Sequence, residues 1–182
     1  MKFVRTALPE VIRVQPDVHG DARGYFLETW HAGKYAEGGI DAAFAQDNHS
    51  RSQRGILRGL HAQLDPPQGK LVRCVAGEIW DVAVDARPAS PTFGQHVAVT
   101  LTGENHEQLW VPAGFLHGFL VLSETADVAY KCTSLYRPEG EIAVAWDDPA
   151  LAIPWPIDAP SLSGRDAEAP PLSHFEARLR AR

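Results

Sequence analysis

The stretch Gly55–Gln63, written GILRGLHAQ, places an arginine and a histidine in an otherwise apolar run. A guanidinium binds anions such as phosphate through paired hydrogen bonds, and an imidazole transfers protons near neutral pH. His61 and Gln63 are two residues apart and share one side of a strand, whereas Arg58, three residues away, would point to the opposite side. A bulge would remove that difference, so we predict an irregularity near Gly59.

A second histidine, His117, ends the stretch Val111–His117, which has the P-x-G-x-x-H spacing of the second motif of cupin barrels. Metal-binding cupins also carry an H-x-H pair followed by a glutamate, and the matching stretch here is His61-Ala62-Gln63. A protein-bound metal usually takes three or four protein ligands, and two histidines are too few. The sequence therefore favours acid–base chemistry, to which an imidazole with a pKa of about 6.5 is well matched.

The elements that must position these residues are mainly strands, whose pattern recurs at short spacing from about residue 44 to residue 147. This spacing predicts an all-β sandwich or barrel. Residues 71–75 and 79–85 are predicted to form a hairpin around Gly77. Polar side chains inside a barrel indicate a binding cavity, because a buried charge without a partner is costly. The candidates for its lining are Arg58, His61, Gln63, Lys70, His117, Tyr130 and Lys131.

Helical pattern is scarce, with one turn predicted over 34–37 and a short amphipathic helix over 175–180. The segment 148–171 is rich in proline, which predicts an irregular strap packed on the barrel. A chain of 182 residues can bury one core well, and two independent cores would each be small. We therefore expect a single domain over residues 1–182.

The net charge of −6 argues against a nucleic-acid partner, which normally requires a broad basic surface. Cys74 and Cys132 stand far apart without C-x-x-C spacing, which indicates two buried thiols in a reducing compartment. Charges interrupt the N-terminal segment where a signal peptide would be apolar, and the longest apolar run, 114–122, is too short to span a bilayer. We expect no membrane partner and a cytoplasmic location.

Six stretches, in order over nearly the whole chain, resemble motifs of the dTDP-4-dehydrorhamnose 3,5-epimerases: DARGYF (21–26), QDNHS (46–50), LRGLH (57–61), GKLVR (69–73), SPTFG (90–94) and Tyr130-Lys131. The resemblance implies a cupin-like jelly-roll barrel, a homodimer, and an enzyme that uses no metal or organic cofactor. It also implies epimerisation of dTDP-4-dehydro-6-deoxy-D-glucose at C3 and C5 on the route to dTDP-L-rhamnose. Both carbons flank the C4 ketone, so loss of either proton gives an enolate.

The resemblance also implies the catalytic roles. His61 is the base, and Asp166 is the carboxylate that orients its imidazole, a pairing that fixes the tautomer and stabilises the imidazolium. Tyr130 is the acid on the opposite face of the sugar, a phenol with an ordinary pKa of about 10. Lys70 lies near the ketone and stabilises the developing enolate.

Further residues match substrate-binding positions of the resembled family, including an aromatic, Tyr136, that stacks on thymine. The N-terminal strand that carries Arg23 and Glu28 is expected to reach across the dimer. Two positions depart from the family pattern, because Arg165 stands where lysine is common and Ala62 where an aromatic residue is frequent. The complete implied binding set is Arg23, Glu28, Gln46, Asn48, Arg58, Lys70, His117, Tyr136, Glu141 and Arg165.

Three alternatives remain open on the sequence. The nearest is an enzyme of the same fold that epimerises only C3 or only C5 of a related dTDP-4-keto sugar. The second is a metal-dependent cupin, against which the missing H-x-H pair argues. The third is a carbohydrate-binding module without catalysis, against which the presence of both His61 and Tyr130 argues.

Overall fold

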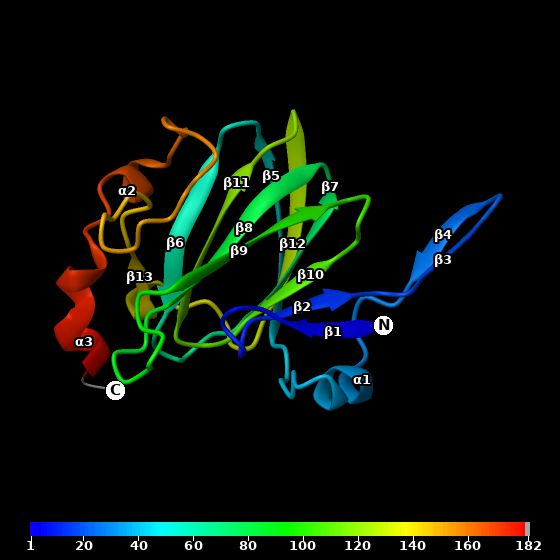
Figure 1. Cartoon of the computed structure of the whole chain (residues 1–182), viewed down its shortest axis with the longest axis horizontal. Coiled ribbons are helices and arrows are strands. Elements are labelled where there is room, and N and C mark those ends of the chain that lie inside the picture. The colour runs from blue at the N-terminus through cyan, green and yellow to red at the C-terminus, as the bar shows by residue number, and fades with distance from the viewer. Residues whose placement is uncertain (181–182) are drawn as a thin grey trace.

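The structure, a computed structural model, describes residues 1–180 and consists mainly of antiparallel strands in two facing sheets (Figure 1). The larger sheet has the spatial order β1 (Lys2–Arg5), β2 (Ile12–Gln15), β10 (Gln108–Val111), β7 (Lys70–Ala76), β12 (Thr125–Cys132) and β5 (Gln46–Gln53). The smaller sheet has the order β13 (Glu141–Ala143), β6 (Leu57–Gln63), β11 (Phe115–Val121), β8 (Glu78–Asp85) and β9 (His96–Thr102). The predicted all-β sandwich is confirmed.

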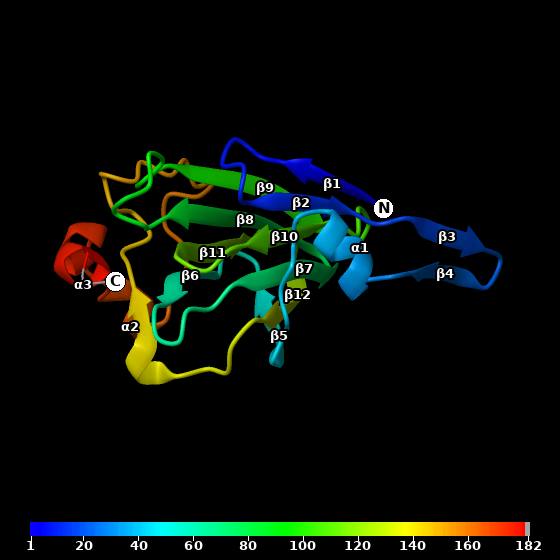
Figure 2. The same ribbon diagram turned by 90° about the horizontal axis from the view of Figure 1, so that it is seen from below.

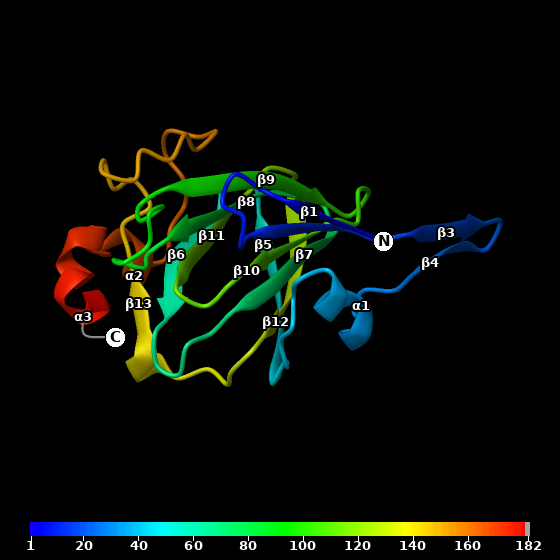
Figure 3. The same ribbon diagram turned by 60° about the horizontal axis from the view of Figure 1, so that its bottom comes forward.

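Apolar side chains fill the space between the two sheets and also cover the far side of the smaller one. Val72 and Val128 from the larger sheet share the first cluster with Phe115 from the smaller sheet. On the other face of the smaller sheet, Val82 and Leu116 belong to a second cluster that includes Leu151, Leu172 and Leu179 from the C-terminal segment. This segment packs beside β6 and β13 (Figure 3). The central strands of the smaller sheet, β8 and β11, are largely buried on both faces.

The predicted hairpin around Gly77 is wrong. Strand β7 pairs with β10 and β12, whereas β8 pairs with β11 and β9, so the two strands belong to different sheets. Gly77 has a φ of 82°, and a Cβ at this position would lie 2.1 Å from the Thr125 carbonyl oxygen. The turn therefore needs glycine, but it carries the chain from one sheet to the other.

The resemblance implied a single N-terminal strand that carries Arg23 and Glu28, whereas the structure has a two-stranded hairpin of β3 (Val18–Asp21) and β4 (Gly24–Leu27), with Arg23 in its turn and Glu28 directly after β4. This hairpin projects away from both sheets (Figures 1 and 2). Tyr25 and Phe26 on β4 are largely exposed. Large exposed aromatic side chains on a projecting element are typical of a surface that meets another molecule.

Short helices complete the fold. They are α1 (Ala32–Glu37), η1 (Pro138–Gly140), α2 (Gly164–Ala167), η2 (Leu172–Phe175) and α3 (Glu176–Arg180). The predicted helical turn at 34–37 and the C-terminal helix are confirmed. The strap over 148–171 is irregular as predicted, apart from α2 and an isolated bridge at Ser161. None of the helices within residues 1–180 is long and apolar enough to cross a membrane.

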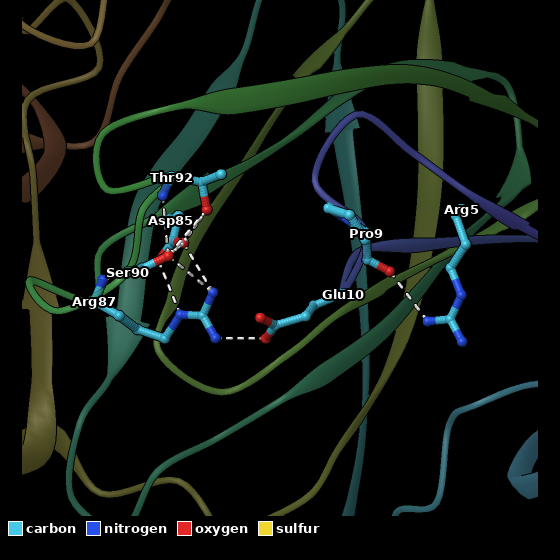
Figure 4. A network of polar contacts seen from close by, with 7 residues as sticks. All are labelled: Arg5, Pro9, Glu10, Asp85, Arg87, Ser90 and Thr92. Atoms are coloured by element: carbon cyan, nitrogen blue, oxygen red, sulfur yellow. Dashed lines mark hydrogen bonds and ion pairs between the residues drawn. The ribbon is translucent and has the colours of Figure 1, made fainter.

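Two side-chain features bear on the core. Asp85, at the end of β8, is fully buried and accepts hydrogen bonds from Arg87, Ser90 and Thr92 (Figure 4). Burial acts to raise the pKa of Asp85, but these hydrogen bonds outweigh it and hold the pKa at about 2. Arg87 also binds Glu10 and so joins the β8–β9 connection to the N-terminal segment. The two cysteines are buried and free, as predicted.

Candidate active site

A cavity of about 590 Å³ opens between the two sheets and is bordered on one side by the strap around α2. Most of the sequence-predicted site residues line it, although they come from six strands, from α2 and from a loop. The larger sheet contributes Gln46, Asn48, Lys70 and Tyr130, and the smaller sheet contributes Arg58, His61, His117 and Glu141. Tyr136, Arg165 and Asp166 complete the predicted residues that meet here.

The His61 ring lies against the Asp166 carboxylate, with 2.6 Å between Nε2 and Oδ1. Asp166 is buried in α2, where its backbone N–H donates to the Oγ of Ser163, the N-cap residue. Burial acts to raise the pKa of Asp166, but hydrogen bonding from His61 and Ser163 holds the pKa below its ordinary value. The ionised carboxylate therefore holds Nε2, and Nδ1 is the ring nitrogen left for the cavity.

The predicted irregularity at Gly59 is confirmed. His117 on β11 faces His61 and Phe119 faces Arg58, so three steps along β6 match two steps along β11. Gly59 has a φ of 134°, and a Cβ there would lie 2.5 Å from the Gly118 Cα. This bulge turns Arg58 to the same side as His61, so both side chains line the cavity. The Arg58 Nε donates to the Ser52 hydroxyl at 3.0 Å.

Tyr130 lies on β12 of the larger sheet, opposite the sheet that carries His61. Burial raises the pKa of the Tyr130 phenol, so the group stays protonated in neutral solution. Lys70, on β7 of the same sheet, borders the same cavity. Burial lowers the pKa of Lys70, against the opposing effect of nearby acidic groups that include Glu141 and Asp81. The cavity thus has an imidazole on one wall and a phenol and an amine on the other.

A polar cluster at one end of the cavity holds Tyr136. The Tyr136 hydroxyl donates to Glu141 Oε2 at 3.0 Å, and the Arg165 guanidinium binds the same oxygen. The backbone N–H of Tyr136 donates to Gln46 Oε1 at 2.8 Å. These hydrogen bonds hold the Tyr136 side chain in place. Because 48% of the residue is exposed, a planar ligand can still reach it.

Two predicted binding residues lie elsewhere. Arg23 is at the tip of the β3–β4 hairpin, exposed and paired with Asp21, and Glu28 follows β4 and pairs with Lys34 at 2.7 Å. Neither lines the cavity of its own chain. The hairpin points away from both sheets (Figure 1).

Two of the candidates for the cavity lining are also placed elsewhere. Lys131 alternates with Tyr130 along β12 and pairs with Asp47 at 2.9 Å on the outer face. Gln63 is buried, but its amide group binds the backbone at Pro66, Leu135 and Arg137 instead of facing the cavity. Gln63 therefore ties two loops together, which a spacing argument from His61 does not reveal.

Several lining residues escaped the sequence analysis. Ser50 follows Gln46 and Asn48 at two-residue spacing along β5, and that period was the signal that could have identified it. Its Oγ is buried without a hydrogen-bond partner among the described residues, which leaves a donor free for a ligand. The others are Ile56, Leu57, Gln68, Phe119, Ser161, Leu162 and Ser163.

The polar groups of the cavity do not form a metal centre. Over residues 1–180, no three or more His, Cys, Asp or Glu side chains are arranged so that they could hold a metal ion. His61 and His117 instead each bind a separate carboxylate, Asp166 and Asp81. This arrangement suits proton transfer.

Comparisons with known proteins point in one direction. The family model described as dTDP-4-dehydrorhamnose 3,5-epimerase matches residues 5–174. The enzyme of that name from Pseudomonas aeruginosa is 53% identical over 170 residues, which cover 92% of this chain and 94% of the relative. That from Neisseria gonorrhoeae is 52% identical over 167 residues, 91% of this chain, and this chain spans about half (51%) of its length.

Among solved structures, the dTDP-6-deoxy-D-glucose-3,5-epimerase of Legionella pneumophila Philadelphia 1, in complex with dTDP-4-keto-L-rhamnose, superposes with a TM-score of 0.95. The two sequences are 51% identical, and the match covers 98% of this chain and 96% of the other. The predicted cupin-like fold is confirmed by this likeness.

Proposed function

The chain belongs to the dTDP-4-dehydrorhamnose 3,5-epimerase family, and we propose that it converts dTDP-4-dehydro-6-deoxy-D-glucose into dTDP-4-dehydro-L-rhamnose for the synthesis of dTDP-L-rhamnose. The observation that carries this proposal is the placement of the His61–Asp166 pair on one wall of a cavity and Tyr130 on the other. Inversion of a carbon centre requires a base and an acid on opposite faces of the sugar.

The proposed reaction begins at His61. Nδ1 removes the proton from C3 or C5, the C–H electron pair moves into a C=C bond, and the C4 carbonyl becomes an enolate. Tyr130 then donates its phenolic proton to the same carbon from the opposite face, and the carbonyl re-forms. Solvent returns the proton from the imidazolium to the phenolate, so each inversion leaves the enzyme unchanged. The Asp166 carboxylate stabilises the imidazolium in between.

The enolate and the diphosphate explain the basic residues of this acidic protein. We assign Lys70 to the enolate oxygen. The attraction between its ammonium group and that oxygen grows as the oxygen becomes negative, and it is stronger where water is excluded. Arg58 and Arg165 are assigned to the diphosphate, and Tyr136 to stacking on thymine, a contact worth about 1–3 kcal/mol. The remaining binding assignments are Gln46, Asn48, His117 and Glu141, which border the same cavity.

We also propose that the enzyme is a homodimer in which Arg23 and Glu28 complete the cavity of the partner. The exposed aromatic residues of the projecting hairpin, Tyr25 and Phe26, support this assembly, because a second chain would cover them. A cytoplasmic location is part of the proposal and is supported by the two free, buried cysteines, which are typical of a reducing compartment.

Proton NMR of the 4-keto sugar nucleotide in D₂O tests the reaction. The wild-type enzyme should introduce deuterium at both C3 and C5 and form the L-sugar, whereas exchange at only one carbon would contradict double epimerisation.

His61→Ala should lower turnover by several orders of magnitude, because no other group replaces the base. Calorimetry with dTDP is the control, since nucleotide binding should survive; near-normal turnover of this variant would refute the assignment.

A further inference from the structure

A second carboxylate–imidazole pair lies beside His61. Asp81 on β8 is fully buried, and His117 on β11 lines the cavity. His117 Nε2 lies 2.9 Å from Asp81 Oδ2 and 3.1 Å from Oδ1. Because His117 is the register partner of His61, the two imidazoles are neighbours on one wall.

The Asp81–His117 pair is poorly explained as a stabilising feature. Asp85 lies on the same face of β8 and is equally buried, yet it receives several hydrogen bonds, including those of Arg87. In the part of the chain that the structure describes, the hydrogen bonds of the Asp81 carboxylate involve His117 alone. Apolar residues of similar volume often stabilise a core as well as a buried ion pair does. The consequence for His117 is therefore the better explanation.

The hydrogen bonds fix which ring nitrogen of His117 is free. An ionised carboxylate only accepts hydrogen bonds, so the nitrogen that faces Asp81, Nε2, carries a proton, and in the neutral ring the lone pair is then on Nδ1. Within residues 1–180 both hydrogen bonds of the ring run through Nε2. Nδ1 is thus an acceptor at the cavity wall, and it needs a donor. Of the sugar ring and its attached diphosphate, the ketone and the ionised phosphates only accept, so the ring hydroxyls are the groups that can donate to Nδ1.

We propose that Asp81 is a positioning residue, which holds His117 so that Nδ1 accepts a hydrogen bond from a hydroxyl of the bound sugar. This inference rests on the proposed function, because it takes the sugar nucleotide as the ligand. The ring carries free hydroxyls on C2 and C3, since C1 bears the diphosphate, C4 the ketone and C5 the methyl group. A hydroxyl held beside His61 places the adjoining C–H bonds against the proposed base.

The tautomer can be measured without turnover. Long-range ¹H–¹⁵N spectra of the wild-type protein, assigned with His117→Phe, should show the His117 proton on Nε2 and none on Nδ1. In Asp81→Asn the amide can also donate to the ring, so the Nδ1–H tautomer should become populated. A wild-type ring protonated on Nδ1 or on both nitrogens, or an unchanged ring in Asp81→Asn, would overturn the proposal.

Kinetics identify the hydroxyl. Asp81→Asn should lower kcat/KM by about tenfold with the full substrate, the effect of spoiling one hydrogen bond. Analogues that lack the C2 or the C3 hydroxyl are then compared by deuterium exchange at C5, which both retain. The analogue without the contacting hydroxyl should be processed equally by wild type and variant. A tenfold difference that persists with both analogues contradicts the proposal.

Asp85→Asn is the matched control, because Asp85 shares the strand, the face and the burial of Asp81, but its partners Arg87, Ser90 and Thr92 do not line the cavity. This variant should lower the unfolding temperature, because it removes a hydrogen-bonded charge, and should leave the His117 tautomer and the analogue ratios unchanged. The two proposals fail separately: a wild-type protein without exchange at C3 and C5 refutes the reaction, and the tautomer measurement still tests Asp81. If Asp81→Asn does not fold, the wild-type spectrum and the kinetics of His117→Phe with both analogues still decide.

Discussion

The hydrogen-bond partners of the two cavity histidines distinguish their roles. His61 and His117 are the same residue type on adjoining strands, and each binds a carboxylate through Nε2. His61 is the more exposed of the two, and its carboxylate comes from a helix in the strap, whereas the partner of His117 lies inside the sheet. We infer that the accessible pair transfers protons and that the buried pair holds the sugar.

The role of Tyr130 gives a prediction at this scale. In Tyr130→Phe the base can still remove a proton, but no acid delivers one from the other face. His61 should then deliver deuterium to the same face from which it removed the proton, so the variant is expected to catalyse exchange in D₂O with little inversion. Overall epimerisation should fall by about 10²–10⁴-fold. NMR of the recovered sugar separates exchange from inversion. Efficient inversion without the phenol would show that another group is the acid.

At the scale of elements, the bulge in β6 decides which side chains meet. Without the extra residue at Gly59, the alternation of a strand would direct Arg58 away from the cavity. The backbone of β11 lies so close to Gly59 that any side chain there would displace it. The bulge therefore depends on glycine both for its φ and for the close approach.

Replacement of this glycine tests the bulge. Gly59→Ala should lower the free energy of unfolding by about 2–4 kcal/mol, because it adds a strained φ and a backbone clash. It should also weaken dTDP binding, since Arg58 shifts relative to His61. Chemical denaturation and calorimetry measure the two effects. Gly164→Ala is the control, because its added methyl group meets nothing within 4 Å. Equal stability and affinity of both variants would argue against a required bulge.

At the scale of the whole molecule, the projecting hairpin separates Arg23 and Glu28 from the cavity that their chain encloses (Figure 2). The cavity of a single chain thus lacks two of the residues assigned to substrate binding. In the proposed two-fold dimer, each chain would supply both residues to the cavity of the other.

Mixing of two impaired variants tests this exchange. Arg23→Ala and His61→Ala should each be weakly active, but a refolded equimolar mixture contains heterodimers in which one cavity has both wild-type residues. Random pairing should restore about one quarter of the wild-type activity. The doubly substituted chain mixed with either single variant is the control, because neither mixture forms an intact cavity. No recovery in the first mixture would show that Arg23 does not act in the cavity of the partner chain.

The sequence determined the local properties of this protein: strands by two-residue periodicity, the proline-rich strap, the irregularity at Gly59, and residue types suited to proton transfer and phosphate binding. Only the tertiary structure decided which strands pair, as the separation of β7 from β8 shows, and which distant groups meet. Asp166 lies 105 residues from His61 in the chain, and Gln63, two residues away, turns out to tie loops together. Periodicity assigns a side chain to a face, but its partner depends on register and packing between segments far apart in sequence, which no local pattern encodes.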